Sequence, residues 1–182
     1  ASRTLELRER AEALDQANQE KIQLLAQLSH QALHDSLTGL PNRTLADQQL
    51  TQAFAAMQTE HISLCIGLMD LDYFKQINDK YGHPTGDEVL RTLGVLLKQQ
   101  QTLWCARVGG EEFVIISREN AAASAVLIES LHQQIATQVM VAMSPAPLRV
   151  TVSIGWVDAG EFDSVEKAMA EADRRLYLAK DT

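Results

Sequence analysis

The sequence has few cysteines, few aromatic residues and little positive charge. Cys65 and Cys105 are the only cysteines among 182 residues, and they lack the Cys-x-x-Cys spacing of redox and metal sites. We therefore expect two small buried thiols in a reducing compartment. The five histidines show no zinc-ligand spacing, so neither redox nor zinc chemistry is predicted. With 16 Lys and Arg against 24 Asp and Glu, the net charge of −8 disfavours a nucleic-acid-binding role.

Long apolar runs are also missing. The longest nearly apolar stretch, residues 121–128, is far shorter than the roughly 18 residues of a membrane-spanning helix. No basic and apolar leader is visible at the N-terminus. We expect a cytoplasmic fragment without membrane contact of its own, whose parent protein can carry an anchor or a sensor upstream of Ala1.

Residues 1–34 differ from the rest of the chain. Apolar side chains there follow 4-3 spacing, with Arg, Glu and Gln between them and no Gly or Pro. The eight seam positions, six of them apolar, are Leu7, Ala11, Leu14, Asn18, Lys21, Leu25, Leu28 and Ala32. This pattern predicts a helix that forms a parallel coiled-coil dimer, with Asn18 fixing the register. The alternative is a solvated helix that packs on its own domain.

Residues 35–182 read as one domain in which strands and helices alternate. Strands are expected at 62–69, 103–108, 111–116 and 148–156, with a two-residue Gly109-Gly110 turn between the middle two. Helices are expected over 50–57, at 73–80, over 89–97, over 127–135 and from Asp163, with Glu166 as its capping partner, and residues 81–86 as a loop. This order predicts an α+β ferredoxin-like fold, an antiparallel sheet with packed helices.

Acidic residues gather at the ends of two predicted strands. Asp70 and Asp72 close the first strand, and Glu111 and Glu112 open the strand after the Gly-Gly turn. If these strands are neighbours, Asp70 and Glu111 meet at one edge and form an oxygen site for Mg²⁺ suited to phosphoryl chemistry. Taken singly, Asp70 is better explained as a strand-end cap, and Glu111 as a solvated hairpin residue.

A second polar cluster lies between those strands and contains Lys75, Asn78, Asp79, His83 and Asp87. An aspartate beside an asparagine matches the donors and acceptors of guanine, and such a site rejects adenine. Helix capping is the structural alternative for Asp87.

The motifs taken together resemble the GGDEF family of diguanylate cyclases. The resemblance rests on residues 70–75 (DLDYFK), 77–79 (IND), 82–83 (GH), 86–87 (GD) and 107–113 (RVGGEEF). Flanking motifs at 35–43 (DSLTGLPNR), 152–155 (VSIG) and between Ala172 and Lys180 follow in the order of the family. The resemblance covers about residues 34–182 and implies a fold like polymerase palm and nucleotidyl-cyclase domains.

The resemblance implies an enzyme that condenses two GTP into cyclic di-GMP with release of two pyrophosphates. Each protomer of a dimer holds one GTP, and the coiled-coil helix 1–34 controls the catalytic domain 35–182. Asp70, Glu111 and the Leu71 carbonyl are implied as ligands of Mg²⁺, with Mn²⁺ as an alternative. Glu111 is also implied as the base for the 3′-hydroxyl, and Glu112 as completing the metal site.

The remaining implied roles concern the substrate. Asn78 and Asp87 would hold guanine with His83 near the nucleotide, and the phosphates would meet Lys75 and Lys180. Gly109 and Gly110 would let the backbone approach those phosphates without a Cβ in the way.

One departure from the family is evident. Many relatives carry an Arg-x-x-Asp product-inhibition site, and residues 100–103 (QQTL) stand in its place, so we expect feedback through that site to be weak or absent. Two alternatives to an active cyclase remain: a non-catalytic GTP-binding sensor module of the same fold, and a dimerising helix with a passive domain attached.

Overall fold

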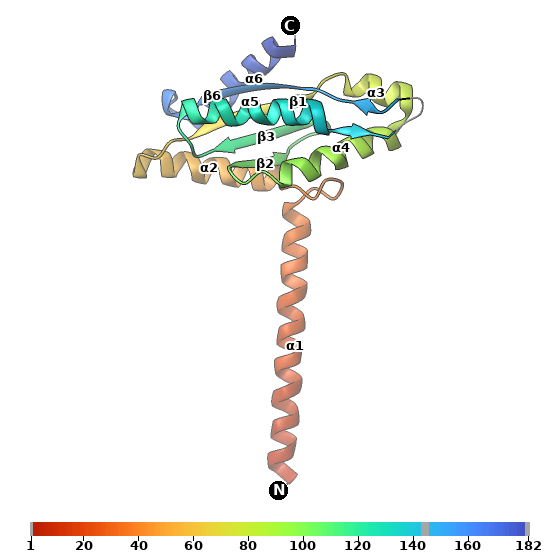
Figure 1. Cartoon of the computed structure of the whole chain (residues 1–182). Helices are drawn as coiled ribbons and strands as arrows, with labels where there is room; N and C mark the ends of the chain where they lie inside the picture. Colours follow the sequence, from red (N-terminus) through yellow and green to blue (C-terminus); the bar gives the residue numbers. More distant parts are fainter. Residues whose placement is uncertain (1, 143–145, 181–182) are drawn as a thin grey trace. The chain divides into compact units, whose positions relative to one another are not determined.

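The computed structural model describes residues 2–142 and 146–180, which fall into two compact units, Ala1–His34 and Asp35–Thr182 (Figure 1). The first unit is one uninterrupted helix, α1 (Ser2–Leu33). Seam side chains of α1 are largely exposed within the single chain, Leu14 by 64% and Leu28 by 52%. Such an exposed apolar stripe is expected of a coiled-coil helix in the absence of its partner helix.

The second unit alternates helices and strands in the order that the sequence predicts, with a short unpredicted strand added at residues 140–141. Its elements are α2 (Arg43–Glu60), β1 (Cys65–Leu71), α3 (Phe74–Tyr81), α4 (His83–Lys98), β2 (Leu103–Arg107), β3 (Glu112–Ser117), α5 (Ala121–Gln138), β4 (Met140–Val141), β5 (Leu148–Arg149), β6 (Val152–Asp158), the 3₁₀ turn η1 (Ala159–Glu161) and α6 (Val165–Lys180). The main sheet has the order β2-β3-β1-β6 with antiparallel pairing throughout, and β4 pairs with β5 separately.

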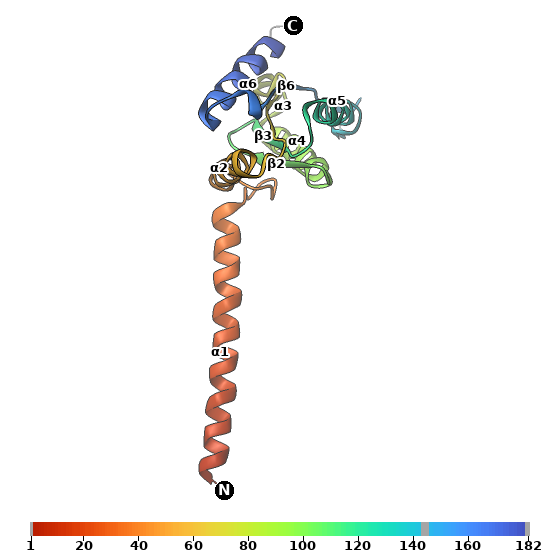
Figure 2. The same ribbon diagram turned by 90° about the vertical axis from the view of Figure 1, so that its left-hand side faces the viewer.

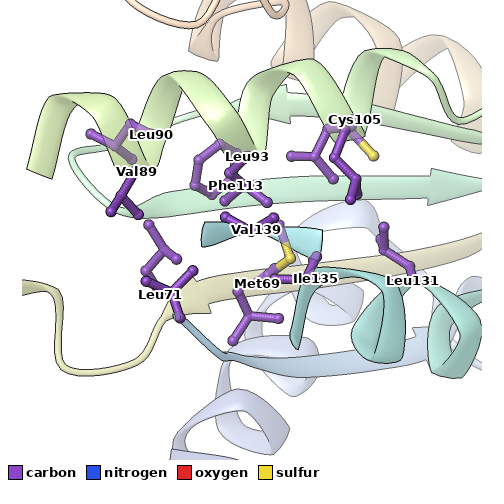
Figure 3. Packing of buried hydrophobic residues seen from close by; sticks show 14 of the residues in the cluster. Met69, Leu71, Val89, Leu90, Leu93, Cys105, Phe113, Leu131, Ile135 and Val139 are labelled. Carbon is purple, nitrogen blue, oxygen red and sulfur yellow. The ribbon is translucent and has the colours of Figure 1, made fainter. Parts of the chain in front are cut away.

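Helices cover both faces of the sheet (Figure 2). On one face, Met69, Leu71 and Phe113 pack against α4 and α5, as Figure 3 shows. On the other, alternate strand residues such as Ile66 and Val114 pack against α2 and α6. Because both faces are buried, the strands are apolar along nearly their whole length. The predicted α+β fold with an antiparallel sheet and packed helices is confirmed.

Several predicted boundaries are wrong. The first strand begins at Cys65 rather than residue 62, and the predicted strand 148–156 is divided between β5 and β6. The predicted loop 81–86 is mostly helix, because Pro84 occupies the first turn of α4 and leaves Gly82, with φ of +88°, to make the break. Ser164, rather than Asp163 with Glu166, caps α6 by accepting the amide of Lys167.

Both thiols are buried, as the sequence predicts, and burial raises the pKa of Cys105 to about 12. Within residues 2–142 and 146–180, no helix is both long enough and apolar enough to cross a membrane.

Candidate functional site

The carboxylates at the ends of β1 and β3 meet at one edge of the sheet. Asp70 pairs in register with Glu112, and the amide of Leu71 donates to the Glu111 carbonyl at 3.2 Å. Only 6% of Asp70 is exposed, whereas Glu112 is open to solvent. The predicted convergence of Asp70 and Glu111 therefore follows directly from the antiparallel register of two neighbouring strands.

A lysine from the end of α6 completes this edge. Lys180 Nζ lies 2.7 Å from Asp70 Oδ1, so the two form an ion pair across the sheet and its covering helix. The position of α6 depends on Gly155 of β6, since a Cβ there would collide with the backbone of Ala172 and Leu176. The glycine of the VSIG motif thus lets α6 lie close on β6 and carry Lys180 to Asp70.

The electrostatic environment of this edge acts on Glu111. Burial raises its pKa above the ordinary value, and the neighbouring charges of Asp70 and Glu112 raise it further, while Lys180 acts in the opposite direction. A raised carboxylate pKa is typical of groups that exchange protons in a reaction. Its causes place Glu111 in the same electrostatic environment as Asp70 and Lys180.

The donor set fits a hard cation that shares its coordination with water and phosphate. Asp70 Oδ1 is buried and accepts no hydrogen bond, because the nearby Lys180 ammonium meets the distance of an ion pair but not hydrogen-bond geometry. Among the described residues, no three His, Cys, Asp or Glu side chains are arranged to hold a metal by themselves. Mg²⁺ is commonly held by one or two carboxylates together with substrate phosphates, which matches this edge.

Asp72 is not part of the carboxylate pair. Its two oxygens accept hydrogen bonds from the hydroxyls of Thr151 at 2.6 Å and Ser153 at 2.7 Å, which anchor the end of β1 to β6. Beside it lies a cavity of about 370 Å³ lined by Asp72, Tyr73, Thr151, Ser153, Ala179 and Lys180. Lys180 and Tyr73, the residue before α3, therefore line the same cavity.

The predicted guanine residues lie at the junction of α3 and α4. Asn78 is half-buried on α3, and its amide oxygen occupies the space that a side chain at Gly86 would fill. Asp87 is therefore next to the point where α4 approaches Asn78, and His83 is exposed one turn earlier on α4. Lys75 is exposed on α3, with no ion pair or hydrogen bond recorded among the described residues.

The Gly109-Gly110 turn is longer than predicted. β2 ends at Arg107 and β3 begins at Glu112, with the amides of Val108 and Gly109 both directed at the Glu112 carbonyl at 2.9 and 3.3 Å. Neither glycine has a positive φ, so this is not the two-residue turn type that the sequence suggests. A Cβ at Gly110 would meet nothing within 4 Å, which leaves open space above the turn.

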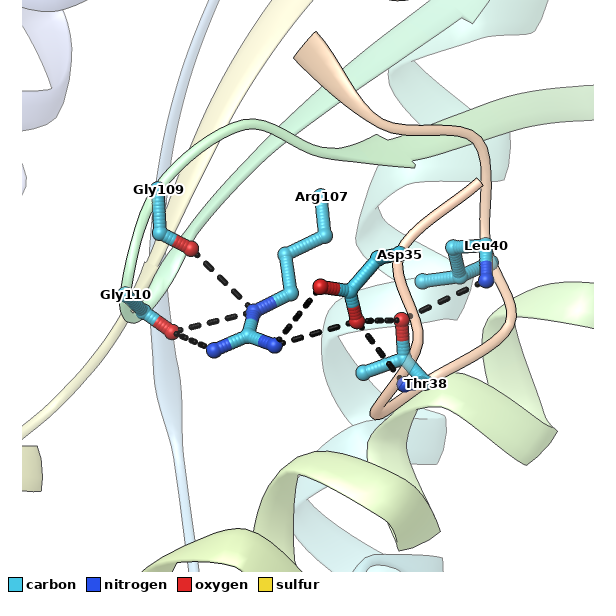
Figure 4. Close-up of polar contacts among 6 residues, drawn as sticks. All are labelled: Asp35, Thr38, Leu40, Arg107, Gly109 and Gly110. Carbon is cyan, nitrogen blue, oxygen red and sulfur yellow. Dashed lines mark hydrogen bonds and ion pairs between the residues drawn. The ribbon is translucent and has the colours of Figure 1, made fainter. Parts of the chain in front are cut away.

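Arg107 fastens this turn to the loop after α1 (Figure 4). Its Nη1 lies 3.0 Å from both carboxylate oxygens of Asp35, and its Nε and Nη2 donate to the carbonyls of Gly109 and Gly110. Asp35 also accepts from the amide and hydroxyl of Thr38. The sequence assigned no role to Asp35 or Arg107, although aspartate is a common turn-forming residue.

The chain is similar to proteins of a known family. A family profile described as "Diguanylate cyclase, GGDEF domain" matches residues 32–182. Diguanylate cyclase DgcS of Shewanella oneidensis is 36% identical over 156 residues, 85% of this chain and 51% of that protein. The bifunctional diguanylate cyclase/cyclic di-GMP phosphodiesterase MucR of Pseudomonas aeruginosa is 38% identical over 94% of this chain and 24% of its own length. The chain therefore spans about half or less of these relatives.

A solved structure matches nearly the whole chain. The coiled coil and GGDEF domain of DgcB from Caulobacter crescentus, in complex with c-di-GMP, has a TM-score of 0.84 and 30% identity. The match covers 95% of this chain and 94% of that one.

Proposed function

Because the chain belongs to the GGDEF domain family of diguanylate cyclases, we propose that it condenses two GTP molecules into cyclic di-GMP and two pyrophosphates. The observation that carries the proposal is the edge formed by Asp70, Glu111 and Lys180, where two carboxylates and an ammonium meet beside an open cavity. A degenerate member would be expected to have lost the carboxylates or the glycines, and this chain retains both.

The reaction consists of two identical transfers. The 3′-hydroxyl oxygen of each GTP attacks the α-phosphorus of the other, and the bond from that phosphorus to pyrophosphate breaks. Each hydroxyl proton passes to a base, for which Glu111 is the candidate because its pKa is raised toward the range of a useful proton acceptor. Lys75 and Lys180 bind phosphate oxygens, and the open space above Gly110 leaves room for the phosphates.

Substrate selection falls to the junction of α3 and α4. The Asp87 carboxylate accepts the N1-H and exocyclic amine of guanine, while Asn78 both donates and accepts, with His83 at the border. Adenine would leave these groups without hydrogen-bond partners, so the site would discriminate strongly against adenine nucleotides. Gly86 supports this assignment, because it keeps Asn78 in place against α4.

A divalent cation, Mg²⁺ or alternatively Mn²⁺, would be held by Asp70, Glu111 and the Leu71 carbonyl with Glu112 completing the site. When bound, it neutralises charge on the phosphates. The buried Oδ1 of Asp70, which forms an ion pair with Lys180 and accepts no hydrogen bond, supports this donor set.

We further propose that residues 1–34 are a dimerising coiled coil that controls the domain of residues 35–182. Each protomer supplies one half-site, so pairing through α1 is needed for turnover. Support comes from the exposed seam, in which Leu7 is 61% and Leu25 56% exposed in the single chain. The fragment is expected to act in the cytoplasm, to bind no nucleic acid and to make no membrane contact of its own.

The test is incubation of the chain with GTP and Mg²⁺ over a range of protein concentrations, with products identified by mass spectrometry. Cyclic di-GMP formed at a rate that rises faster than linearly with protein supports a dimeric cyclase. Glu111→Gln should abolish turnover, while Glu119→Gln, an exposed carboxylate after β3, should not.

A second pair of variants separates the helix from the site. Leu14→Glu with Leu28→Glu places two charges in the seam and should lower the rate at nanomolar protein, whereas Gln16→Glu with Gln23→Glu adds the same charge outside it. Saturable GTP binding without product, even when dimerisation is enforced, would favour the alternative, a non-catalytic GTP-binding sensor module. A chain that dimerises but binds no GTP would instead indicate a passive domain.

A further inference from the structure

The last part of α1 has an unusual distribution of charge. Residues 1–21 carry arginine, lysine, glutamate and aspartate, but residues 22–34 contain none of these. The only titratable side chains in that segment are His30 and His34. Neither residue is used by the proposed cyclase site, so their arrangement needs a separate explanation.

The two imidazole rings are stacked. Their centroids lie 3.8 Å apart and their planes differ by 4°. Four residues separate them, so their side chains project from the same face of the helix. His34 Nδ1 also lies 2.9 Å from the carbonyl oxygen of His30.

That last contact determines which nitrogen of His34 carries a proton. A carbonyl oxygen only accepts, so Nδ1 must be the donor. In the neutral ring, Nε2 then keeps its lone pair. A histidine held by an Nδ1-H to carbonyl bond, with Nε2 available, is the usual arrangement of a metal-ligating imidazole.

From these contacts we propose that His30 and His34 form a two-nitrogen site for a transition-metal ion of the Zn²⁺, Ni²⁺ or Cu²⁺ class, with water in the remaining positions. Zn–N bonds of about 2.0–2.1 Å at a tetrahedral angle place the two nitrogens about 3.4 Å apart. In the stacked arrangement the lone pairs lie in parallel ring planes and do not converge on one point, so at least one imidazole must turn out of the stack to bind. The C-terminal end of a helix also favours a positive ion.

The site is compatible with the proposed coiled coil. At about 100° per residue, His30 lies about 200° around the helix from the seam residue Leu28, and His34 about 200° from Ala32. The metal would therefore bind on the outer side of a dimer, with one ion per chain. Binding does not depend on pairing or on the cyclase reaction.

Zinc chemistry is not predicted from the sequence, because the five histidines do not show zinc-ligand spacing. A pair at i and i+4 on a helix is a weaker but real chelating pattern. Within the described residues no set of three ligands exists, which is consistent with a site of two protein nitrogens and water.

The experiment is a titration of the whole chain with Zn²⁺ against a chromophoric chelator, with Mg²⁺ in excess to cover the carboxylate edge. We expect one Zn²⁺ per chain at pH 7.5. His30→Ala and His34→Ala should each lower the apparent affinity at least tenfold. His61→Asn is the matched control, because His61 is a lone exposed histidine at φ of +55°, a conformation that asparagine tolerates.

Two further measurements make the test decisive. Binding should weaken in acid, because protons compete with the metal ion for the imidazole nitrogens. Circular dichroism of each variant checks that α1 remains helical. Unchanged affinity in both histidine variants overturns the proposal, as does Zn²⁺ binding that disappears only in Glu111→Gln, since the ion would then occupy the carboxylate edge.

Discussion

The guanidinium of Arg107 makes a bifurcated contact with the carboxylate of Asp35, with Nη1 3.0 Å from each oxygen, although 72 residues separate the two in sequence. The same guanidinium holds the carbonyls of Gly109 and Gly110. The turn that is expected to face substrate phosphates is therefore fixed to the loop with which the domain begins. This relationship gives two predictions about stability and pH.

Arg107→Ala should lower the free energy of unfolding by about 2 kcal/mol, because it removes hydrogen bonds to a partly buried carboxylate and leaves Asp35 without its counter-charge. Urea denaturation of the domain measures this directly. Arg91→Ala is the control, since Arg91 forms an exposed pair with Glu88 of the kind that contributes little. Equal losses in the two variants would show that the Arg107 contacts are not structural.

The second prediction is a loss of stability in acid that depends on Asp35. Burial acts to raise the pKa of Asp35, but the Thr38 hydrogen bonds and Arg107 outweigh it, and the net pKa is lowered. A lowered carboxyl pKa contributes stability that is present above the unfolded pKa of about 3.9 and is lost as the pH falls through the folded value.

Asp35→Asn should thus be less stable than the parent chain at pH 6, and the difference should shrink as the pH falls below about 4. Thermal unfolding at several pH values checks this. A difference that stays constant over the same range would mean that the charge of Asp35 is not what stabilises the loop.

A third prediction concerns Gly86. A methyl group there would collide with the amide oxygen of Asn78, so Gly86→Ala should displace Asn78 and weaken GTP binding. The collision should be relieved in part when Asn78 is shortened, because Phe74 is then the remaining close neighbour. The destabilisation by Gly86→Ala should accordingly be smaller in an Asn78→Ala background, a non-additivity that a double-mutant cycle measures.

For comparison, Gly110→Ala should leave the unfolding temperature nearly unchanged, because its new side chain would enter open space. A Gly86→Ala chain with normal GTP affinity would argue against Asn78 as a guanine contact.

The fourth prediction is weak product feedback through residues 100–103. The Gln100 amide is directed at the Leu96 carbonyl and at Gln134 of α5, at 3.3 and 3.2 Å, and Leu103 is buried at the start of β2. This surface offers neither the cation nor the carboxylate of the Arg-x-x-Asp site. Added cyclic di-GMP should therefore inhibit only in competition with GTP; inhibition that GTP does not relieve would contradict the prediction.

Features that depend on residues close together in the sequence could be predicted from it, whereas contacts between distant segments could not. The alternation of strands and helices was readable because both sheet faces are buried, and the meeting of Asp70 with Glu111 followed once β1 and β3 were assumed to be neighbours. The start of α4 was missed because glycine, proline and threonine resemble a loop, although Pro84 is well suited to a first helical turn.

The contacts that the sequence did not predict join distant segments. The bond of Asp35 to Arg107 and those of Asp72 to Thr151 and Ser153 have no local signal. The same holds for Lys180 beside Asp70, which requires both the register of the sheet and the close approach of α6 that Gly155 permits. Here the family resemblance supplied a role for Lys180, but not its partner.

The pairing of Lys180 with Asp70 has a further consequence for how the site is occupied. The chain supplies its own counter-ion to Asp70, whose side chain is only 8% exposed, and this offsets part of the cost of burying that charge. A divalent ion bound at Asp70 must share or take over that oxygen from the ammonium. The displaced lysine then needs an anion, and a nucleotide phosphate can supply it. Binding of the metal ion and binding of the nucleotide should therefore favour each other.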